Sequence, residues 1–259
     1  MPAELRSISH GQTMVLTLHN PEHRNRLEPG MVAAAVEALN AAGDNADIRS
    51  VVIVGEGDAF CDGVGAHRLR DSRAQPAASQ ADLIDALNLL VETVSTFPMP
   101  VVAAVEGPAT GAGFALALAC DMVVAARDAV FALPQGRLGV APDGGASWHL
   151  AQALPRPLAN EIALLGEPVP AERLYALGLV NRLVAPGQAL SAALALADTL
   201  NQRAPNVLEG TKELLAAAPH VTLGRHLAAE RTQVLVTLNH ANAGIGLAAF
   251  MQKRVPDFE

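Results

Sequence analysis

Two glycine-rich corners, each of which follows a short β-branched run, constrain this chain more than any other feature. The first is Phe60-Cys61-Asp62-Gly63-Val64, and the second runs from Gly107 to Gly113 with the sequence GPATGAG. A corner of this kind can leave backbone N–H groups without partners in their own segment. Two such groups that converge on one point form an oxyanion hole, which favours chemistry on a carbonyl.

The order of strand-like and helix-like segments around these corners predicts an α/β fold. Apolar and β-branched runs favour strands at 13–18, 51–54, 101–105, 122–126 and 129–132. Apolar residues at helical spacing favour helices at 29–43 and 82–96, and the uncharged segment 113–119 favours a buried helix. Because strands and helices alternate, we predict a parallel α/β body through about residue 190.

Beyond residue 189 the pattern is helical only. Four segments, 189–203, 206–217, 222–240 and 242–252, are separated by Pro or Gly. We therefore divide the chain into a core, residues 1–190, and a helical C-terminal region, residues 191–259, to which we assign oligomerisation. The polar stretch at 67–80 is predicted to be a mobile surface segment.

The composition argues against several classes of protein. With 259 residues, of which 51% are hydrophobic, the chain can bury one large core, and its apolar surplus favours a homo-oligomer. A net charge of -8 and only 3% aromatic residues argue against nucleic acid as a partner. The N-terminus lacks a signal-peptide pattern, and no apolar run approaches the roughly 18 residues of a membrane span. We expect a cytoplasmic protein with no membrane contact, no metal, and reduced thiols at Cys61 and Cys120.

Six motifs follow one another along almost the whole chain. They are NPEHRNRL at 20–27, AFCDG at 59–63, the second corner at 105–113, Cys120-Asp121, GVAPDGG at 139–145 and GLAAFMQKRVP at 246–256. In this order they resemble the crotonase superfamily, the enoyl-CoA hydratases and isomerases. The resemblance implies a crotonase-type ββα spiral core with a helical C-terminal region, assembled as homotrimers or hexamers. It also implies an acyl-CoA substrate of fatty-acid type metabolism, with coenzyme A as part of the substrate and no other cofactor.

The same resemblance assigns the two oxyanion-hole donors to the backbone amides of Val64 and Ala112. Negative charge develops on a thioester oxygen when an α-proton leaves or a nucleophile adds to the conjugated double bond. Each preorganised donor contributes about 2.7 to 4 kcal/mol at that point. The helix that begins near Gly113 adds the positive end of its dipole. The alternative for each corner alone is an ordinary turn from strand to helix.

The resemblance also matches further residues of this chain to substrate-binding positions of the family. Arg24 matches the residue that meets the CoA phosphates, and the backbone from Asp62 to Ala66 matches the adenine-binding loop. Phe250 and Lys253 match residues that reach the CoA of a neighbouring subunit, although a solvated helix end explains such a lysine equally well. The remaining matched positions of the acyl and CoA site are Gly63, Gly111, Ala115, Gln135 and Trp148.

The chain departs from the hydratases at the two positions that matter most for adding water. Those enzymes use two glutamates, which hold the water and deliver a proton. The corresponding residues here are Ala115 and Gln135. Neither side chain can give or take a proton usefully, so we do not expect an efficient conventional hydratase.

One carboxylate remains nearby, Asp143 in the third corner. The combination of Gly-Ala-Gly at the second corner, no glutamate at either position, and Pro-Asp followed by Gly and Trp resembles the phenylacetate-pathway epoxide and enoyl-CoA isomerases. The related CoA dehalogenases pair an aspartate nucleophile with a histidine and a tryptophan, where this chain has Asn88 and Gln135. The isomerases are therefore the better match.

A single carboxylate is sufficient for a 1,3-proton shift. Asp143 would take a proton from one acyl carbon and return it to another, while the enolate is held in the oxyanion hole. Return of the proton requires an apolar site that raises the carboxyl pKa, and Trp148, Phe114 and Leu138 are candidate walls. The alternative role of Asp143 is to cap the helix that begins near Gly144.

Three functions remain open at this stage. The first is an isomerase of enoyl-CoA or ring-epoxide acyl-CoA with Asp143 as the only proton shuttle. The second is another crotonase reaction, such as weak hydration, hydrolysis or C–C cleavage by a lyase. The third is an acyl-CoA-binding protein without turnover. Dinucleotide and Walker fingerprints are absent, so neither NAD nor ATP is implied.

Overall fold

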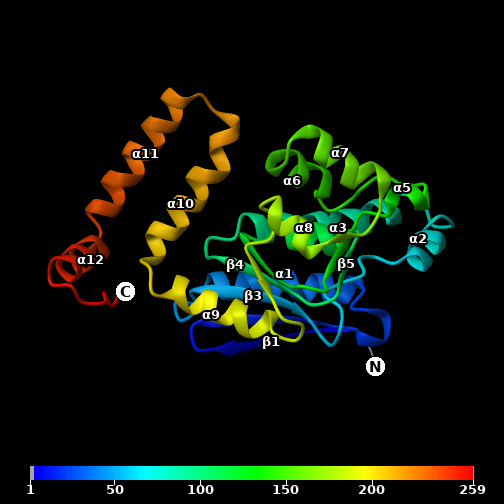
Figure 1. Cartoon of the computed structure of the whole chain (residues 1–259), viewed down its shortest axis with the longest axis horizontal. Coiled ribbons are helices and arrows are strands. Elements are labelled where there is room, and N and C mark those ends of the chain that lie inside the picture. The colour runs from blue at the N-terminus through cyan, green and yellow to red at the C-terminus, as the bar shows by residue number, and fades with distance from the viewer. Residues whose placement is uncertain (1–2, 259) are drawn as a thin grey trace.

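The computed structural model describes residues 3–258, which form an α/β core and a helical arm (Figure 1). The main sheet has the strand order β1-β2-β3-β4-β6-β9. Its strands are β1 (Glu4–His10), β2 (Thr13–His19), β3 (Ser50–Gly55), β4 (Val101–Val105), β6 (Met122–Ala126) and β9 (Arg182–Val184). Only β1 runs antiparallel to its neighbour, and the other pairs are parallel. The predicted parallel α/β body is therefore confirmed.

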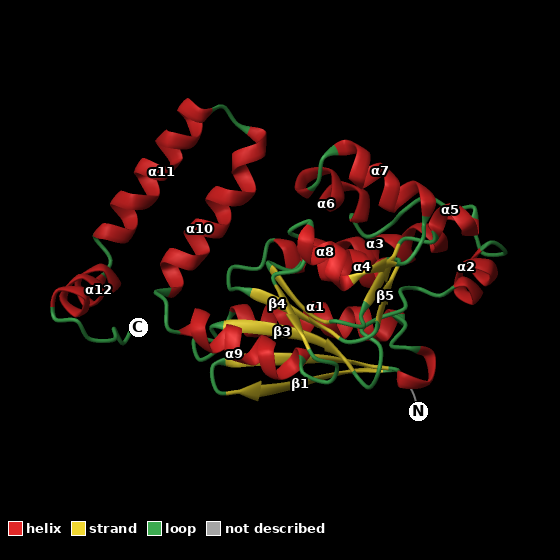
Figure 2. Ribbon diagram, in the orientation of Figure 1, coloured by secondary structure: helices red, strands yellow, loops and turns green. Residues whose placement is uncertain are grey.

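The two faces of the main sheet are buried by different helices (Figure 2). Alternate residues of β3 divide between them, so Val51 and Ile53 pack in the larger core with α1 (Pro29–Gly43) and α3 (Ala77–Ser95). Val52 and Val54 face the opposite way, against α9 (Ala189–Asn201). Strands buried on both faces have continuous apolar sequences, which is why β3 and β4 could be predicted from the sequence.

A second, three-stranded sheet lies beside the first and carries the second glycine corner. It consists of β5 (Pro108–Thr110), β7 (Val130–Ala132) and β8 (Val169–Pro170). Between β5 and β6 lies α4 (Ala112–Ala119), in which every residue but Leu118 is buried, as its lack of charge predicts. The remaining helices of the core are α5 (Gln135–Leu138), α6 (Ala146–Ala153), α7 (Arg156–Leu165) and α8 (Ala171–Ala176).

The stretch at 67–80 lies at the surface as predicted, but the sequence did not predict that it is helical. It forms α2 (Ala66–Ser72) and, after a short turn, the first residues of α3. These helices are largely exposed, so their sequence lacks the apolar stripe on which a helix prediction depends. Side-chain bonds hold the turn between them, because Gln80 Nε2 donates to the carbonyl oxygens of Ser72 and Gln75.

Three helices form an arm that extends from the core after α9 (Figure 1). They are α10 (Pro205–Ala217), α11 (Leu223–Leu238) and α12 (Ala241–Met251), close to the predicted ranges. Lys212 fastens α10 to the core, since its Nζ donates to Phe97 O, Met99 O and Asp121 Oδ2 at 2.7, 2.9 and 2.6 Å. The helical C-terminal region is thus confirmed, while its role in oligomerisation stays a prediction.

No single helix among residues 3–258 has both the length and the apolar character needed to cross a membrane. Helices α11 and α12 reach that length only together, and they are bent by 79° at the break between them.

Candidate active site

The first and second corners run side by side because their backbones bond directly to each other. The amides of Phe60 and Cys61 donate to Pro108 O at 3.1 and 3.2 Å, and Thr110 N donates to Cys61 O at 2.8 Å. These bonds continue the parallel order of β3 and β4 beyond the main sheet, with Cys61 bridged to Ala109. The two segments that the sequence places far apart therefore meet at one place.

Glycine is required where the two corners approach most closely. Gly63 has a φ of +66°, and a Cβ there would lie 2.7 Å from Thr110 O and 3.0 Å from Ala112 N. At Gly113, a Cβ would lie 2.1 Å from Cys61 O. Both positions exclude any larger residue, so α4 begins directly against the first corner.

A cavity of about 610 Å³ opens between these corners, the third corner and the helices α2, α3 and α5. Val64 and Ala112 both line it. Within residues 3–258, neither amide donates a hydrogen bond to a protein acceptor. Ala112 is the first residue of α4, so the positive end of this helix dipole adjoins the cavity. The remaining lining residues are Arg26, 62–63, 65–66, Leu69, Ile84, Asn88, 110–111, 134–135, Leu138 and 140–145.

Asp143 lines the same cavity and is half-buried. Its Oδ1 accepts a hydrogen bond of 3.1 Å from Gln135 Nε2. Gln135 is itself only 6% exposed, and it lies beside Gly111, where a Cβ would be 3.3 Å from Nε2. The structure thus brings together the only carboxylate of the third corner, the amide that replaces a glutamate, and the second corner.

The alternative role of Asp143 as a helix cap is not the one its side chain adopts. Helix α6 begins at Ala146, its N-cap is Gly145, and no side chain caps it. Only the main-chain oxygen of Asp143 accepts from Ala146 N, at 3.3 Å. The prediction of a cap is therefore wrong for the carboxylate, which faces Gln135 instead.

Ala115, which was predicted in the substrate site, is not among the residues that line the cavity. Its side chain is fully buried in α4, and a Cβ on Gly144 would lie only 3.0 Å from the Ala115 Cβ. The third corner is therefore packed directly on Ala115. This close packing and a φ of +59° explain why the corner needs glycine at position 144.

The predicted phosphate contact, Arg24, lies outside the cavity and is exposed. Its carbonyl accepts from Asp62 N at 2.9 Å, so it helps to hold the first corner. The arginine that lines the cavity is Arg26, whose guanidinium pairs with Asp62 at 3.4 Å. Sequence reasoning passed over Arg26, although it stands two residues further along the same motif. Ala66 and Gly63 line the cavity as predicted.

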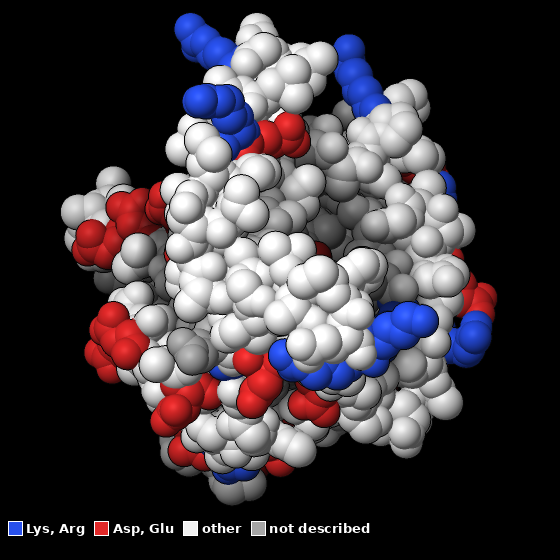
Figure 3. Space-filling view, turned by 90° about the vertical axis from the view of Figure 1, so that its left-hand side faces the viewer, with Lys and Arg blue, Asp and Glu red and all other residues white. Residues whose placement is uncertain are grey.

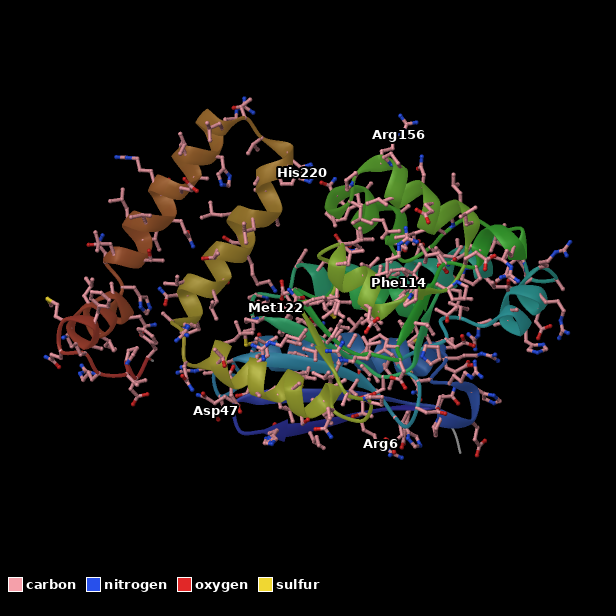
Figure 4. All side chains as sticks on the ribbon, viewed as in Figure 1. Arg6, Asp47, Phe114, Met122, Arg156 and His220 are labelled. Atoms are coloured by element: carbon pink, nitrogen blue, oxygen red, sulfur yellow. The ribbon has the colours of Figure 1, made fainter. Side chains whose placement is uncertain are left out.

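Two of the three candidate walls lie elsewhere. Phe114 is buried inside the core against Phe131, with ring centroids 5.1 Å apart (Figure 4). Trp148 is 51% exposed and stacks on His220 at the tip of the arm, with centroids 6.3 Å apart. Leu138 lines the cavity. Trp148 stands five residues after Asp143, and the sequence does not show which way its side chain points, so only the structure could place it.

Phe250 and Lys253 lie at the far end of the arm, remote from the cavity of their own chain (Figure 1). The Phe250 side chain is 83% exposed. Their predicted contact with CoA of a neighbouring subunit stays a prediction.

Three further titratable residues near the corners, Cys61, Cys120 and Glu106, have structural surroundings. Burial raises the pKa of the Cys61 thiol to about 12, and it raises that of Cys120 as well. The Glu106 carboxylate accepts from Gly187 N and Ala189 N at 3.0 and 2.7 Å, and so fixes the start of α9. Among residues 3–258, no group of His, Cys, Asp and Glu side chains has the arrangement of a metal site.

Comparisons with known proteins agree with this architecture. Residues 9–259 match the family model described as enoyl-CoA hydratase/isomerase. The chain is 33% identical to the 2,3-dehydroadipyl-CoA hydratase of Escherichia coli, over 96% of this chain and 95% of that protein. It is also 33% identical to the 1,2-epoxyphenylacetyl-CoA isomerase of the same organism, over 95% and 94%.

A crystal structure of an enoyl-CoA hydratase from Polaromonas sp. JS666 shares the whole fold. Its TM-score is 0.97 at 51% sequence identity, with 99% of this chain and 100% of that chain covered. The fold and its paired corners are those of a crotonase-type α/β protein. The chain belongs to the enoyl-CoA hydratase/isomerase family of enzymes.

Proposed function

We propose that this enzyme isomerises an enoyl-CoA, moving a double bond along the acyl chain with Asp143 as its only acid–base group. The observation that carries the proposal is the cavity itself. It is lined by the two corner amides and by Asp143, while the two glutamate positions of the hydratases hold Ala115 and Gln135. Ring-epoxide acyl-CoA thioesters are the second substrate class of this proposal.

In the proposed reaction the thioester oxygen accepts hydrogen bonds from the amides of Val64 and Ala112. The Asp143 carboxylate removes a proton from C2 of a 3-enoyl thioester, and the C–H electron pair delocalises into a dienolate. The same carboxyl group then returns the proton to C4, which leaves a 2-enoyl thioester. Atoms and charge balance without a co-reactant, and the oxyanion hole stabilises the charge at the intermediate.

Two further features support an acyl-CoA as the ligand. The N-terminus of α4 places a positive dipole end beside the cavity, where the enolate oxygen would lie. Arg26, which pairs with Asp62, is a cation that lines the same cavity and could meet an anionic group of CoA. Phe250 and Lys253 would meet CoA from a neighbouring subunit of a homotrimer or hexamer.

Hydration is the second candidate, because relatives named as hydratases match the chain over nearly its full length. In that reaction Asp143 would serve as the base for water without a second carboxylate. The two functions differ in their product, since hydration forms a 3-hydroxyacyl-CoA and isomerisation adds no water. Binding without turnover is the third possibility.

The test replaces Asp143 by Asn and follows conversion of a 3-enoyl-CoA by absorbance and mass spectrometry. We expect kcat to fall by about 10²- to 10⁴-fold, with the dissociation constant of a saturated acyl-CoA kept within about 3-fold. Asp128→Asn, at an exposed turn, is the control for loss of one negative charge. Unchanged turnover in Asp143→Asn would exclude the proposal, and a mass gain of one water would favour hydration.

A further inference from the structure

Of the two polar atoms in the Gln135 side chain, only the nitrogen makes a hydrogen bond within the described residues. Its Nε2 donates to Asp143 Oδ1 at 3.1 Å. Its Oε1 is buried and, within the described part of the chain, accepts no hydrogen bond. A buried acceptor without a partner costs free energy, because it has lost its bonds to water. An unbranched apolar side chain such as Met would fill a similar space without this cost.

The carboxylate at the other end of this bond has no further side-chain support. Within residues 3–258, the bond from Gln135 is the only hydrogen bond that the Asp143 side chain makes. Asp143 is followed by Gly144 and Gly145, with φ values of +59° and +74°, which are conformations that a flexible glycine corner supplies. The direction of the carboxylate therefore depends on Gln135.

Gln135 also connects the carboxylate to the second corner. Its Nε2 lies close to Gly111, the residue before the Ala112 amide. An amide at this position donates at every pH and carries no charge. A carboxylate of the same shape would donate nothing when ionised, and it would face Asp143 with like charge.

We propose that Gln135 is a positioning residue, which fixes the Asp143 carboxylate relative to the second corner by holding Oδ1, and that the chain retains it at a cost to stability. Oδ2 is then the oxygen that takes and returns the proton. This inference rests on the proposed function of Asp143. It extends that function by assigning a role to the side chain that replaces a hydratase glutamate.

The experiment compares Gln135→Met and Gln135→Glu with the unaltered protein, using the same 3-enoyl-CoA. We expect kcat to fall about 10- to 100-fold in both variants, as for a misplaced catalytic group. The dissociation constant of butyryl-CoA, measured by calorimetry, should stay within about 3-fold. The denaturation midpoint of Gln135→Met should be unchanged or higher, whereas a purely structural glutamine would lower it.

A double-variant cycle separates this inference from the proposed function. If Gln135 acts through Asp143, adding Gln135→Met to Asp143→Asn should produce no further loss of kcat. Full kcat in Gln135→Met and Gln135→Glu, or a lower denaturation midpoint in Gln135→Met, would overturn the inference while Asp143→Asn remains inactive. Full kcat in Asp143→Asn would overturn the proposed function itself.

Discussion

At the scale of single residues, Gly63 allows the two corners of the proposed oxyanion hole to approach each other closely. Gly63→Ala places a methyl group 2.7 Å from Thr110 O and 3.0 Å from Ala112 N, so the two corners must separate. We expect a loss of about 10²- to 10³-fold in kcat, the value for one displaced donor. The measurement is steady-state turnover of the 3-enoyl-CoA.

The matched control for this variant is Gly57→Ala. Gly57 also has a positive φ, +80°, but a Cβ there meets nothing within 4 Å. Both variants carry the conformational strain of a non-glycine residue, about 1–3 kcal/mol, and only one carries the clash. Equal kcat in the two variants would show that separation of the corners does not matter.

The two cysteines should be inert in the folded protein. Burial raises the pKa of Cys61 to about 12 and also raises that of Cys120, so both stay protonated near neutral pH. We expect no labelling by a thiol reagent at about pH 8, and labelling of both residues after unfolding. Rapid modification of the native protein would contradict this account.

The residues proposed to react could be named from the sequence, but their contacts could not. Asp143, Val64 and Ala112 stand out by their motifs, and all three line one cavity. The bond between Gln135 and Asp143 depends on rotamers and on the path of the third corner, which no local pattern encodes. The same limit explains why Trp148 was expected at the cavity and Arg26 was not, while the contact of Arg24 with CoA phosphates stays a prediction.

At the scale of elements, Lys212 is the main polar link between the arm and the core. Lys212→Met leaves the Asp121 carboxylate without its cation and the carbonyls of Phe97 and Met99 without their donor. The two charged side chains are 18% and 25% exposed, so water reaches them in part. We expect a loss of about 2–3 kcal/mol at neutral pH, measured by denaturant unfolding.

This loss should depend on pH. Burial raises the pKa of Asp121 above its ordinary value, and Lys212 opposes that rise. Ionised Asp121 therefore lowers stability as pH rises through the pKa of the folded state, and removal of Lys212 deepens the effect. The difference between the two proteins should grow between about pH 4 and pH 7. In an Asp121→Asn background the effect of Lys212→Met should no longer vary with pH.

Elements whose apolar residues follow the period of a helix or strand were predictable, including α11, which buries no residue. The ranges of α1, β3, β4, β6 and α9 to α12 agree with the sequence because their apolar pattern matches their period. Strand β1 was missed because it lies at the sheet edge and is almost wholly exposed. The strands β5, β8 and β9 are only two or three residues long and form by pairing with distant partners. Segments this short have no sequence pattern that would predict a strand.

At the scale of the whole molecule, the arm exposes several large apolar side chains. Leu223, Leu227, Val234 and Leu238 follow one face of α11 and are 72%, 53%, 59% and 57% exposed. The side of the molecule that bears the arm has a largely uncharged centre (Figure 3). Only Glu230 adds a charge to this face, between Leu227 and Val234, and we predict that the face contacts another copy of the chain.

Light scattering tests this expectation. We expect a mass of three or six times the 26.8 kDa of one chain, and a shift toward a single chain in the variant Leu223→Asp with Leu227→Asp. Leu164→Asp is the control, because Leu164 is 74% exposed on α7, outside the arm. A single-chain mass for the unaltered protein would contradict the predicted homotrimer or hexamer.

The central claim is that one thioester oxygen lies between two main-chain amides, next to a single carboxylate. The most direct measurement is a crystal structure of the protein with butyryl-CoA, which binds without reacting. We predict that the carbonyl oxygen lies about 2.7–3.1 Å from both Val64 N and Ala112 N, with Asp143 beside C2. A carbonyl oxygen that reaches only one of these nitrogens, or neither, would contradict the account.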